Sequence, residues 1–407
     1  MDNVTHTLIG VLLGETAVRH APPAKDVRYA SIRRGLFLSV MVVGSNIPDS
    51  DLLYSLGSNG KLRYLLEHRG HTHTVIGALF ESAVVLAACA LWLRWRRATL
   101  ESRDRIRLVA LAVLAPLLHI GMDAFNTYGV HPWWPFDDRW FYGDSVFIVE
   151  PLFWAAAAPL ALLLQSYVAR GLVVLVLLGG LYLAFTTGLV TRDSIVLYCT
   201  LVVLMLAIGW KAPPRAALLA SIGIWLATTA GFTIAGRQAA SGLAAYAAQN
   251  TPQWTTLDRV LSPMPMNPRC WDVILIQADG DRYALRRGIA SLAPSTSCPT
   301  RSVPQAITAP LTNVALPDTP FLHWHGEVIG SRDQLRELAA TSCEVAAFLR
   351  FARTPWLIVE SARKVVGDLR YDREPGLGFA EIDLDRSSAC PAYVPPWIPP
   401  RRDLLER

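Results

Sequence analysis

The sequence predicts a mainly α-helical fold, in which a polytopic membrane bundle is followed by a smaller α+β soluble domain. The composition indicates a membrane protein, because 52% of the 407 residues are hydrophobic, only 17% are charged and the mean hydropathy is +0.31. Long apolar runs end near residue 240, where prolines and strand-like segments begin. The chain is long enough for both parts.

Eight apolar runs are candidate membrane spans, since a helix that crosses a bilayer needs roughly 17 to 25 residues. The first two are weaker, because one is short and carries Glu15 and the other is broken by Asn46 and Pro48. No removable signal peptide is expected, since no basic residue precedes the first run and no small-residue cleavage motif follows it. The eight runs cover residues 4–19, 35–53, 75–93, 106–122, 146–165, 171–190, 194–210 and 216–235.

Basic residues in the short loops predict the orientation. The loop between the third and fourth spans carries six arginines from Arg94 to Arg107, so it is expected in the cytoplasm. The loop of residues 123–145 then lies outside, and its tryptophans resemble the aromatic belt of a membrane boundary. An even number of spans places the C-terminal domain outside as well. We expect a multi-pass protein of the bacterial inner membrane with a periplasmic C-terminal domain.

The C-terminal domain is expected to be α+β. Residues Trp271–Ile276 have the composition of a strand, and Asp279–Asp281 those of a turn. Residues Ser331–Arg353 have helical spacing of apolar side chains. Acidic and basic residues nearly balance there, which argues against a nucleic-acid surface, while a protein partner stays open. The expected regions are 1–165 for the metal-site helices, 166–240 for further transmembrane helices and 241–407 for the soluble domain.

Four of the six cysteines lie in the C-terminal domain, and two lie in predicted spans. Four thiols allow three pairings, and the sequence does not choose among them. An oxidising periplasm is the natural compartment for disulfides, with unpaired buried thiols as the alternative. The four are Cys270, Cys298, Cys343 and Cys390.

Short polar clusters rich in histidine and aspartate lie at the ends of the apolar helices in the first third of the chain. On the predicted topology they all end at the outer face of the membrane. Imidazole and carboxylate are the ligands that zinc, manganese and iron share. The clusters therefore predict a divalent metal site, with zinc as the first choice. The expected ligands are His6, Asp49, Asp51, His68, His73, His119 and Asp123.

The spacing within the clusters suits a shared ion. His119 and Asp123 are four residues apart and so lie on one face of a helix. Pro48 favours an extended backbone, in which Asp49 and Asp51 point the same way. For any single histidine, an interfacial polar residue is the commoner explanation. For the whole set a cation is favoured, because buried carboxylates without a partner are costly.

Three residues are candidates for catalytic roles. Arg69 could clamp a phosphate through two-point contacts, and its neighbour His68 could be either a second ligand or part of that clamp. Glu150 could be a ligand or a general base, or simply an interfacial glutamate. Asp51 or Glu150 could orient the attacking water. Two other histidines, His20 and His131, are expected at the surface.

A resemblance to a known family rests on four ordered motifs. They are Thr5-His6, Asn46-x-Pro48-Asp49-x-Asp51, His68-Arg69-Gly70-x-Thr72-His73 and His119-x-x-x-Asp123. Over residues 1–165 they resemble the YdjM-like family of inner-membrane metal-dependent hydrolases, some of which are described as LexA-regulated. Position 71 is variable in that family's motif, so His71 is a weaker ligand candidate than His73.

The ligand order also resembles, more distantly, that of the helical zinc-dependent phospholipase C and single-strand nuclease group. On that comparison the ligands that carry over are His6, Asp49 or Asp51, His73, His119 and Asp123. The second His-x-x-x-Glu of that group has no match after Asp123, which puts its full three-zinc cluster in doubt.

The expected function is hydrolysis by a membrane-bound enzyme. A cation held by histidines and aspartates lowers the pKa of bound water and polarises a phosphoryl or carbonyl oxygen. Because the site would open at the level of the outer headgroups, a phospholipid or a lipid-linked phosphate is the expected substrate. Two other classes stay open. One is a transporter or ion-binding protein, and the other is a structural metal site that positions the outer domain.

Few residues of the outer domain point to a function. His323 and His325 would lie on one face of a strand, where surface residues are the commoner explanation. The stretch from Pro395 to Arg402 is rich in proline and is expected to form an extended tail.

Overall fold

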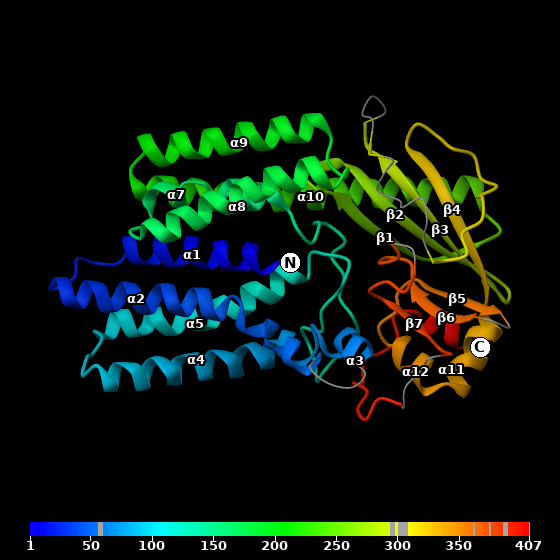
Figure 1. Ribbon diagram of the computed structural model, residues 1–407, viewed down its shortest axis with the longest axis horizontal. Coiled ribbons are helices and arrows are strands. Elements are labelled where there is room, and N and C mark those ends of the chain that lie inside the picture. The colour runs from blue at the N-terminus through cyan, green and yellow to red at the C-terminus, as the bar shows by residue number, and fades with distance from the viewer. Residues whose placement is uncertain are drawn as a thin grey trace.

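The computed structural model describes residues 1–55, 60–293, 298–299, 308–360, 363–373, 376–385 and 390–406. Helices occupy one end of the elongated molecule, and two sheets with short helices occupy the other (Figure 1). The long helices are α1 (Asn3–Arg19), α2 (Val27–Gly44), α4 (Val75–Trp95), α5 (Ser102–Asp123), α8 (Tyr167–Thr186), α9 (Arg192–Lys211) and α10 (Pro214–Asn250). Shorter elements of this part are η1 (Ile47–Ser55), α3 (Gly60–Glu67), η2 (His71–His73), α6 (Pro151–Ala156) and α7 (Leu160–Leu163).

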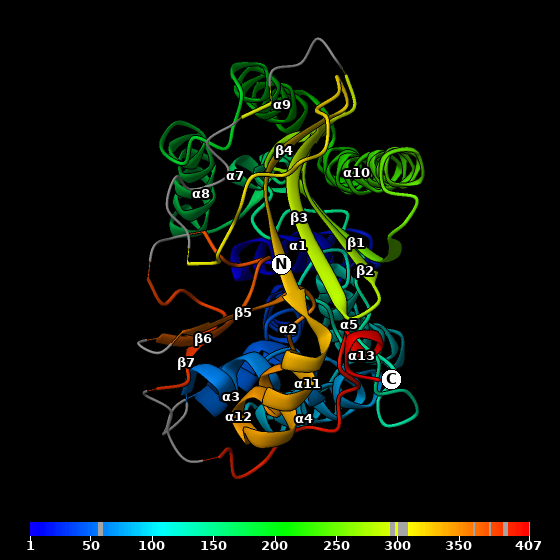
Figure 2. The same cartoon turned by 90° about the vertical axis from the view of Figure 1, so that its right-hand side faces the viewer.

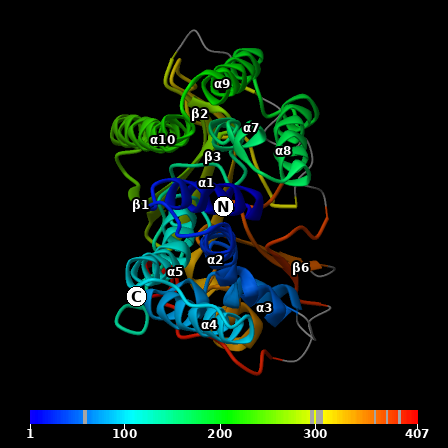
Figure 3. The ribbon, with the colours of Figure 1, turned by 90° about the vertical axis from the view of Figure 1, so that its left-hand side faces the viewer.

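The long helices run roughly parallel to one another (Figure 1). Several begin at a polar side chain that accepts a backbone N–H of the first turn, as Asp2 does for α1, Thr74 for α4 and Ser166 for α8. Viewed along the bundle, α1 lies between a group formed by α2, α4 and α5 and a group formed by α7 to α10 (Figure 3). The first group carries the motifs that predict a metal site.

Five helices are long and apolar enough to cross a membrane, and the bent pair α2–η1 would make a sixth. The helical membrane fold is therefore confirmed, with fewer full spans among the described residues than the eight expected. The first expected span is α1, which has only 17 residues. The expected span of residues 146–165 contains the short helices α6 and α7. Helix α1 thus matches the expected run of residues 4–19, whereas the run of residues 146–165 is divided into two short helices.

The connection between α4 and α5 lies at the end of the bundle away from the sheets (Figure 1). Two buried ion pairs join helices near that end. Arg33 of α2 lies 3.2 Å from Asp104 of α5, and Arg34 of α2 contacts Glu15 of α1. Glu15, which weakened the first expected span, thus has a basic partner on the neighbouring helix.

The second part contains two antiparallel sheets. The larger has the order β1-β2-β3-β4, and the smaller β5-β6-β7. The predicted strand lies within β2, and the predicted turn joins β2 to β3 through Gly280, whose φ of 57° suits glycine. The predicted helical segment forms α11 (Arg332–Thr341) and α12 (Cys343–Phe348), and α13 (Arg402–Leu405) is near the end of the chain. The strands are β1 (Thr255–Met264), β2 (Asn267–Asp279), β3 (Arg282–Ser291), β4 (Leu322–Ser331), β5 (Pro355–Glu360), β6 (Arg363–Asp368) and β7 (Glu381–Asp383).

Helix α10 continues from the bundle onto one face of the larger sheet (Figures 1 and 2). Its last turns bury Ala239, Leu243 and Tyr246 against Trp271 and Leu275 of β2. The helix therefore crosses the domain boundary expected at residue 240. Burial of this apolar surface is why the helix does not end where the membrane part ends.

The opposite face of the larger sheet shares a hydrophobic core with the membrane part. This core joins Ile276 and Leu285 of the sheet to Leu65 of α3 and to Trp140 of the loop that follows α5. Polar contacts also cross the boundary: Arg353 Nη1 lies 2.8 Å from Asp144 Oδ1, and Trp140 donates to the Arg350 carbonyl at 2.8 Å. The two parts are thus packed together by apolar and polar contacts.

Two disulfides link the four cysteines of the C-terminal part. They join Cys270 to Cys298 and Cys343 to Cys390. The structure thereby selects one of the three pairings that the sequence left open. The other two cysteines, Cys89 and Cys199, are free.

The proline-rich segment before α13 is extended, as expected, but it is not a free tail. Trp397 is fully buried, and its ring nitrogen donates to the Leu66 carbonyl at 2.7 Å. The Ile398 N–H donates to the Asp138 carbonyl at 3.1 Å. The segment therefore binds back onto the loops of the membrane part.

Candidate metal centre

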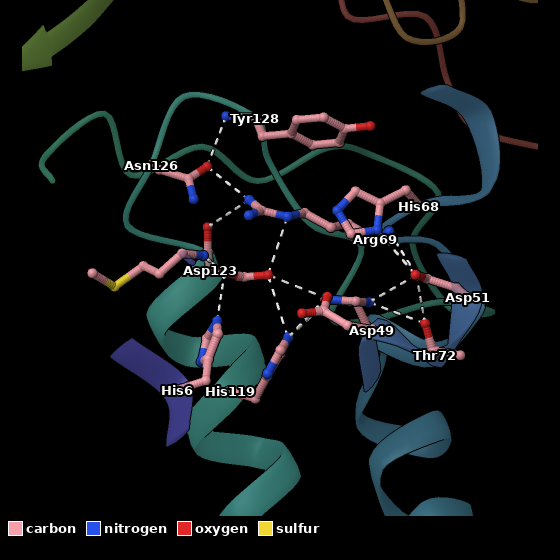
Figure 4. A network of polar contacts seen from close by, with 12 residues as sticks. His6, Asp49, Asp51, His68, Arg69, Thr72, His119, Asp123, Asn126 and Tyr128 are labelled. Atoms are coloured by element: carbon pink, nitrogen blue, oxygen red, sulfur yellow. Dashed lines mark hydrogen bonds and ion pairs between the residues drawn. The ribbon is translucent and has the colours of Figure 1, made fainter. Parts of the chain in front are cut away.

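Five side chains from four separate segments meet where the helices end and the sheets begin (Figure 4). His6 comes from the first turns of α1, Asp49 from η1 and His73 from η2, and His119 and Asp123 come from the last turns of α5. All five are buried. Segments distant in sequence therefore converge at one depth.

Four of these residues form a compact ligand set: Asp49, His73, His119 and Asp123 each offer an atom within 4.8 Å of the others. His73 Nε2 lies 3.1 Å from His119 Nε2, 3.5 Å from Asp49 Oδ1 and 3.3 Å from Asp123 Oδ2. His119 Nε2 lies 3.5 Å from the same two oxygens. Ligands at about 2.1 Å from a tetrahedral ion are about 3.4 Å apart, so the set fits a four-coordinate divalent metal.

The outer nitrogens of the two histidines have acceptors, which leaves their Nε2 atoms toward the carboxylates. His119 Nδ1 lies 2.7 Å from the Ser45 carbonyl, and His73 Nδ1 lies 3.2 Å from Asp51 Oδ2. Both oxygens can accept, so each Nδ1 can donate, and with an ion bound each Nε2 would present its lone pair to it.

Asp51 lies behind His73 and organises the surrounding loop. Its carboxylate accepts the Arg69 backbone N–H and the Thr72 hydroxyl, each at 2.9 Å, and pairs with His68 Nδ1 at 2.9 Å. A carboxylate bound to the far nitrogen of a ligating histidine fixes the ring and raises its basicity. Asp51, Asp49 and His68 also form a second group within 4.8 Å, so a second ion at this place would share Asp49.

His6 and Arg69 also contact the Asp123 carboxylate. His6 Nε2 lies 3.2 Å from Asp123 Oδ1, and its ring stacks on His119 at 3.7 Å between centroids. Arg69 Nε lies 3.1 Å from Asp123 Oδ2, and Arg69 Nη1 donates to Asn126 at 2.8 Å. The Met1 amino group also contacts Asp123. His6 is thus a neighbour of the four-ligand set and not a member of it.

A cavity of about 460 Å³ lies beside this centre, between the membrane part and the C-terminal part. Arg69 and His68 line it from the membrane side, and Tyr371 and Arg373 from the C-terminal side. Burial lowers the pKa of His68, which keeps its ring neutral near pH 7. Its Nδ1 is taken by Asp51, and within the described part of the chain its Nε2 has no hydrogen-bond partner.

Two expectations about single residues are corrected. Glu150 is not part of either ligand group, because its carboxylate caps α6 at Leu152 and accepts the Met266 backbone N–H. His131 was expected at the surface but is fully buried, whereas His20 is exposed as expected. Both buried residues have roles in packing that spacing alone does not reveal.

His71 lies outside the cluster, as its weaker ranking implied. Its ring contacts Trp134 at 4.6 Å and Trp397 at 5.1 Å between centroids. In the C-terminal part, His323 is exposed and pairs with Asp318 at 3.2 Å, as expected for a surface residue, whereas His325 is half-buried.

The residues that hold the ligands were missed. Asn3 donates to Asp49 Oδ2 at 2.7 Å, Ser45 provides the carbonyl for His119, and Thr72 binds Asp51. Each lies within four residues of a predicted ligand. That proximity is the one signal that could have identified them, because backbone carbonyls leave no mark in a sequence.

Comparison with known proteins confirms the family resemblance for the membrane part. Residues 1–192 match the family described as YdjM inner membrane protein. The uncharacterized protein YfhP of Bacillus subtilis (strain 168) is 31% identical over 140 residues, which are 34% of this chain and 39% of that protein. No solved structure matches. The chain is thus a multi-pass membrane protein, YdjM-like in its first 192 residues and with a buried cluster that could hold a metal ion.

Proposed function

From the YdjM-like membrane part and the buried ligand set, we propose that the protein is a metal-dependent hydrolase of lipid phosphoesters. The observation that carries the proposal is the buried cluster of Asp49, His73, His119 and Asp123 beside a cavity lined by Arg69 and His68. Zinc suits two imidazoles and two carboxylates at these spacings. When bound, such an ion supplies Lewis acidity and a water whose pKa is near neutral.

The chain's own residues can support the reaction in three ways. The free Nε2 of His68 faces the cavity side and can accept or donate a proton, while Asp51 holds its ring. Arg69 is held by Asp123 and Asn126, so its charge is fixed close to where a phosphoryl oxygen would gain charge. Arg69 keeps the phosphate-binding role expected from the sequence, whereas Asp51, expected to orient the water, here holds the rings of His68 and His73. Glu150 is not part of this mechanism.

An apolar groove supports a lipid as the substrate. A groove of about 410 Å³ lies between α1 and α8, lined mainly by Leu8, Leu172 and Val176. Asn3 also lines it and donates to Asp49, so the groove reaches the ligand set. An acyl chain is the occupant that a bilayer offers to an apolar groove on a membrane helix pair. The cavity on the other side of the ligand set can then take the headgroup.

The experiment combines metal analysis and hydrolysis on the full chain in detergent. We expect about one metal ion per chain, lost in His119→Ala and kept in His20→Ala, which alters an exposed histidine. His68→Ala is expected to keep the ion while the rate on short-chain phospholipids falls about a hundredfold. Leu172→Trp, which fills the groove, should raise KM for those lipids and leave a water-soluble phosphodiester unaffected.

Two results would count against this function. Full metal content without hydrolysis of any phosphoester would leave a structural metal site as the better explanation, because closed four-ligand sites are typically structural. Unchanged metal content in His119→Ala would remove the metal centre itself. Two ions per chain, with one lost in Asp51→Asn, would assign the second group of Asp49, Asp51 and His68 as a further metal site.

A further inference from the structure

The cavity between the two parts is built from residues of both. The loop after α5 contributes Asn126 and Tyr128, and the segment after β6 contributes Arg370, Tyr371 and Arg373. Among the described residues that line this cavity, none is acidic. A cavity with cationic and aromatic walls and no carboxylate favours an anion.

Among the described residues, Arg373 has no carboxylate closer than that of Asp272, whose Oδ2 lies 3.9 Å from Arg373 Nη2. Asp272 already makes a two-point pair with Arg287, at 2.7 Å and 3.1 Å. Two guanidinium groups thus share one carboxylate, which leaves a net positive charge at the cavity wall. The side chain of Arg373 is 39% exposed, so it can reach a ligand.

Arg370, by contrast, is already satisfied. It pairs with Asp368 through two nitrogens, at 2.7 Å and 3.0 Å, and donates to the Thr127 carbonyl at 2.6 Å. Its role is to tie the C-terminal part to the loop after α5. The available positive charge in the cavity is therefore that of Arg373.

An unsatisfied donor lies on the membrane side of the cavity. Asn126 is 2% exposed, and its Nδ2 has no hydrogen-bond partner in the described part of the chain. Its Oδ1 is engaged by Arg69, which fixes the direction of the amide. On the other side, the Tyr371 hydroxyl also has no partner among the described residues. A buried donor without a partner is rare in a protein, and a bound acceptor is one explanation for it.

We propose that this cavity binds the phosphate of a headgroup, with Arg373, Tyr371 and Asn126 as the recognising groups. The inference rests on the proposed hydrolase, because it places the polar end of the same substrate opposite the acyl groove. It gives the C-terminal part a function, since Arg373 and Tyr371 belong to it. Phosphate suits the site because it accepts several donors at once and pairs with a guanidinium group in two-point geometry.

The test is a binding measurement on full-length protein in detergent, made both with metal added and after treatment with a chelator. The probes are glycerol 3-phosphate and a short-chain phosphatidylglycerol, with a matched uncharged diacylglycerol as the control ligand. We expect binding of the phosphate probes that Arg373→Gln weakens about tenfold or more. Arg373→Lys should bind these probes with intermediate affinity, because lysine keeps the positive charge but cannot make the two-point contact of a guanidinium group. Arg269→Gln is the matched variant, since Arg269 is exposed and lies outside this cavity, and should bind as the unaltered protein does.

The outcomes separate the two proposals. Binding that requires the metal and is insensitive to Arg373 would overturn the cavity site and leave the hydrolase standing. Binding that depends on Arg373 in a protein that hydrolyses no ester would support the site and overturn the hydrolase. Tighter binding of phosphatidylglycerol than of glycerol 3-phosphate identifies a lipid headgroup as the source of the phosphate, and the reverse order identifies a soluble phosphate ester.

Discussion

His131 shows how a single residue can be placed wrongly by its type. Its ring stacks on Trp397 at 3.8 Å and contacts Trp140 at 3.9 Å between centroids. Burial lowers its pKa from 6.5 to about 3. The ring is therefore neutral in the folded protein and protonated below about pH 6.5 in the unfolded chain. The contribution of the neutral His131 ring to the free energy of unfolding is fully present above pH 6.5, and it is lost as the pH falls towards 3.

A change from pH 7.5 to pH 5 should thus lower the free energy of unfolding by about 2 kcal/mol through His131. His131→Phe keeps a ring between the two tryptophans and removes the titration, so its melting temperature should depend less on pH over this range. His20→Phe, at an exposed histidine, should keep the full dependence. Melting curves in detergent at both pH values measure the difference. Equal pH dependence in all three proteins would show that His131 is not the group concerned.

The sequence could identify the candidate ligand residues, but it could not separate direct ligands from their neighbours. Spacing and helix ends placed Asp49, His73, His119 and Asp123 together, and the structure brings these four into one set. His6 and Asp51 were grouped with them as equals, yet they contact the ligands from behind. Whether a side chain is a ligand or a neighbour depends on a few ångströms in its position. The spacing of residues in a sequence does not predict positions that closely.

At the scale of elements, the sequence predicted long helices well and short ones poorly. Apolar runs of about 20 residues predict spans because length and hydropathy act together. The bend between α2 and η1 lies at Asn46 and Pro48, which were noted as a break, and it places Asp49 beside α5. The extended backbone expected after Pro48 was wrong, because Asp49 and Asp51 lie in the 3-10 helix η1. The extended segment around Trp397 was also predicted, but its docking was not, because proline content predicts backbone shape and not contacts.

That segment supports the metal centre from a distance. Trp397 packs on Gly70, where even a Cβ atom would lie 3.1 Å from the indole ring. Gly70 lies between Arg69 and His73, so loss of the indole should loosen this loop. Trp397→Ala is expected to cost about 3 to 5 kcal/mol of stability and to weaken metal affinity, although Trp397 touches no ligand of the four-residue set.

Trp397→Phe should have a stability and a metal affinity between those of the unaltered protein and of Trp397→Ala, since it keeps a ring and loses the hydrogen bond to Leu66. Tyr393→Ala is the control on the same segment, because Tyr393 is exposed. Metal titration at a temperature where all variants remain folded separates affinity from stability. Unaltered affinity in folded Trp397→Ala would show that the segment only stabilises the fold.

For the whole molecule, the sequence predicted two parts and left their contact unknown. Composition separates a membrane bundle from a soluble domain, but the shared core of Leu65, Trp140 and Ile276 joins residues far apart in the chain. No periodicity in one segment reveals such contacts. The α4–α5 connection, which carries the arginines, and the two sheets lie at opposite ends of the molecule (Figure 1).

The sidedness leads to a labelling prediction. In a background where Cys89 and Cys199 are serine, Phe136→Cys is expected to react in intact cells with a maleimide that does not cross membranes. Phe136 is 87% exposed in the loop beside the metal centre. Arg105→Cys, in the first turn of α5, should react only after the cells are permeabilised. The reverse pattern would place the metal centre in the cytoplasm.

The length of α10 decides how the larger sheet is joined to the bundle. A helix of 37 residues is about 55 Å long, whereas the hydrocarbon core of a bilayer is about 30 Å thick. A helix of this length extends well beyond such a core, and its last turns pack on β2. The bundle and the larger sheet are therefore connected through one continuous helix that belongs to both.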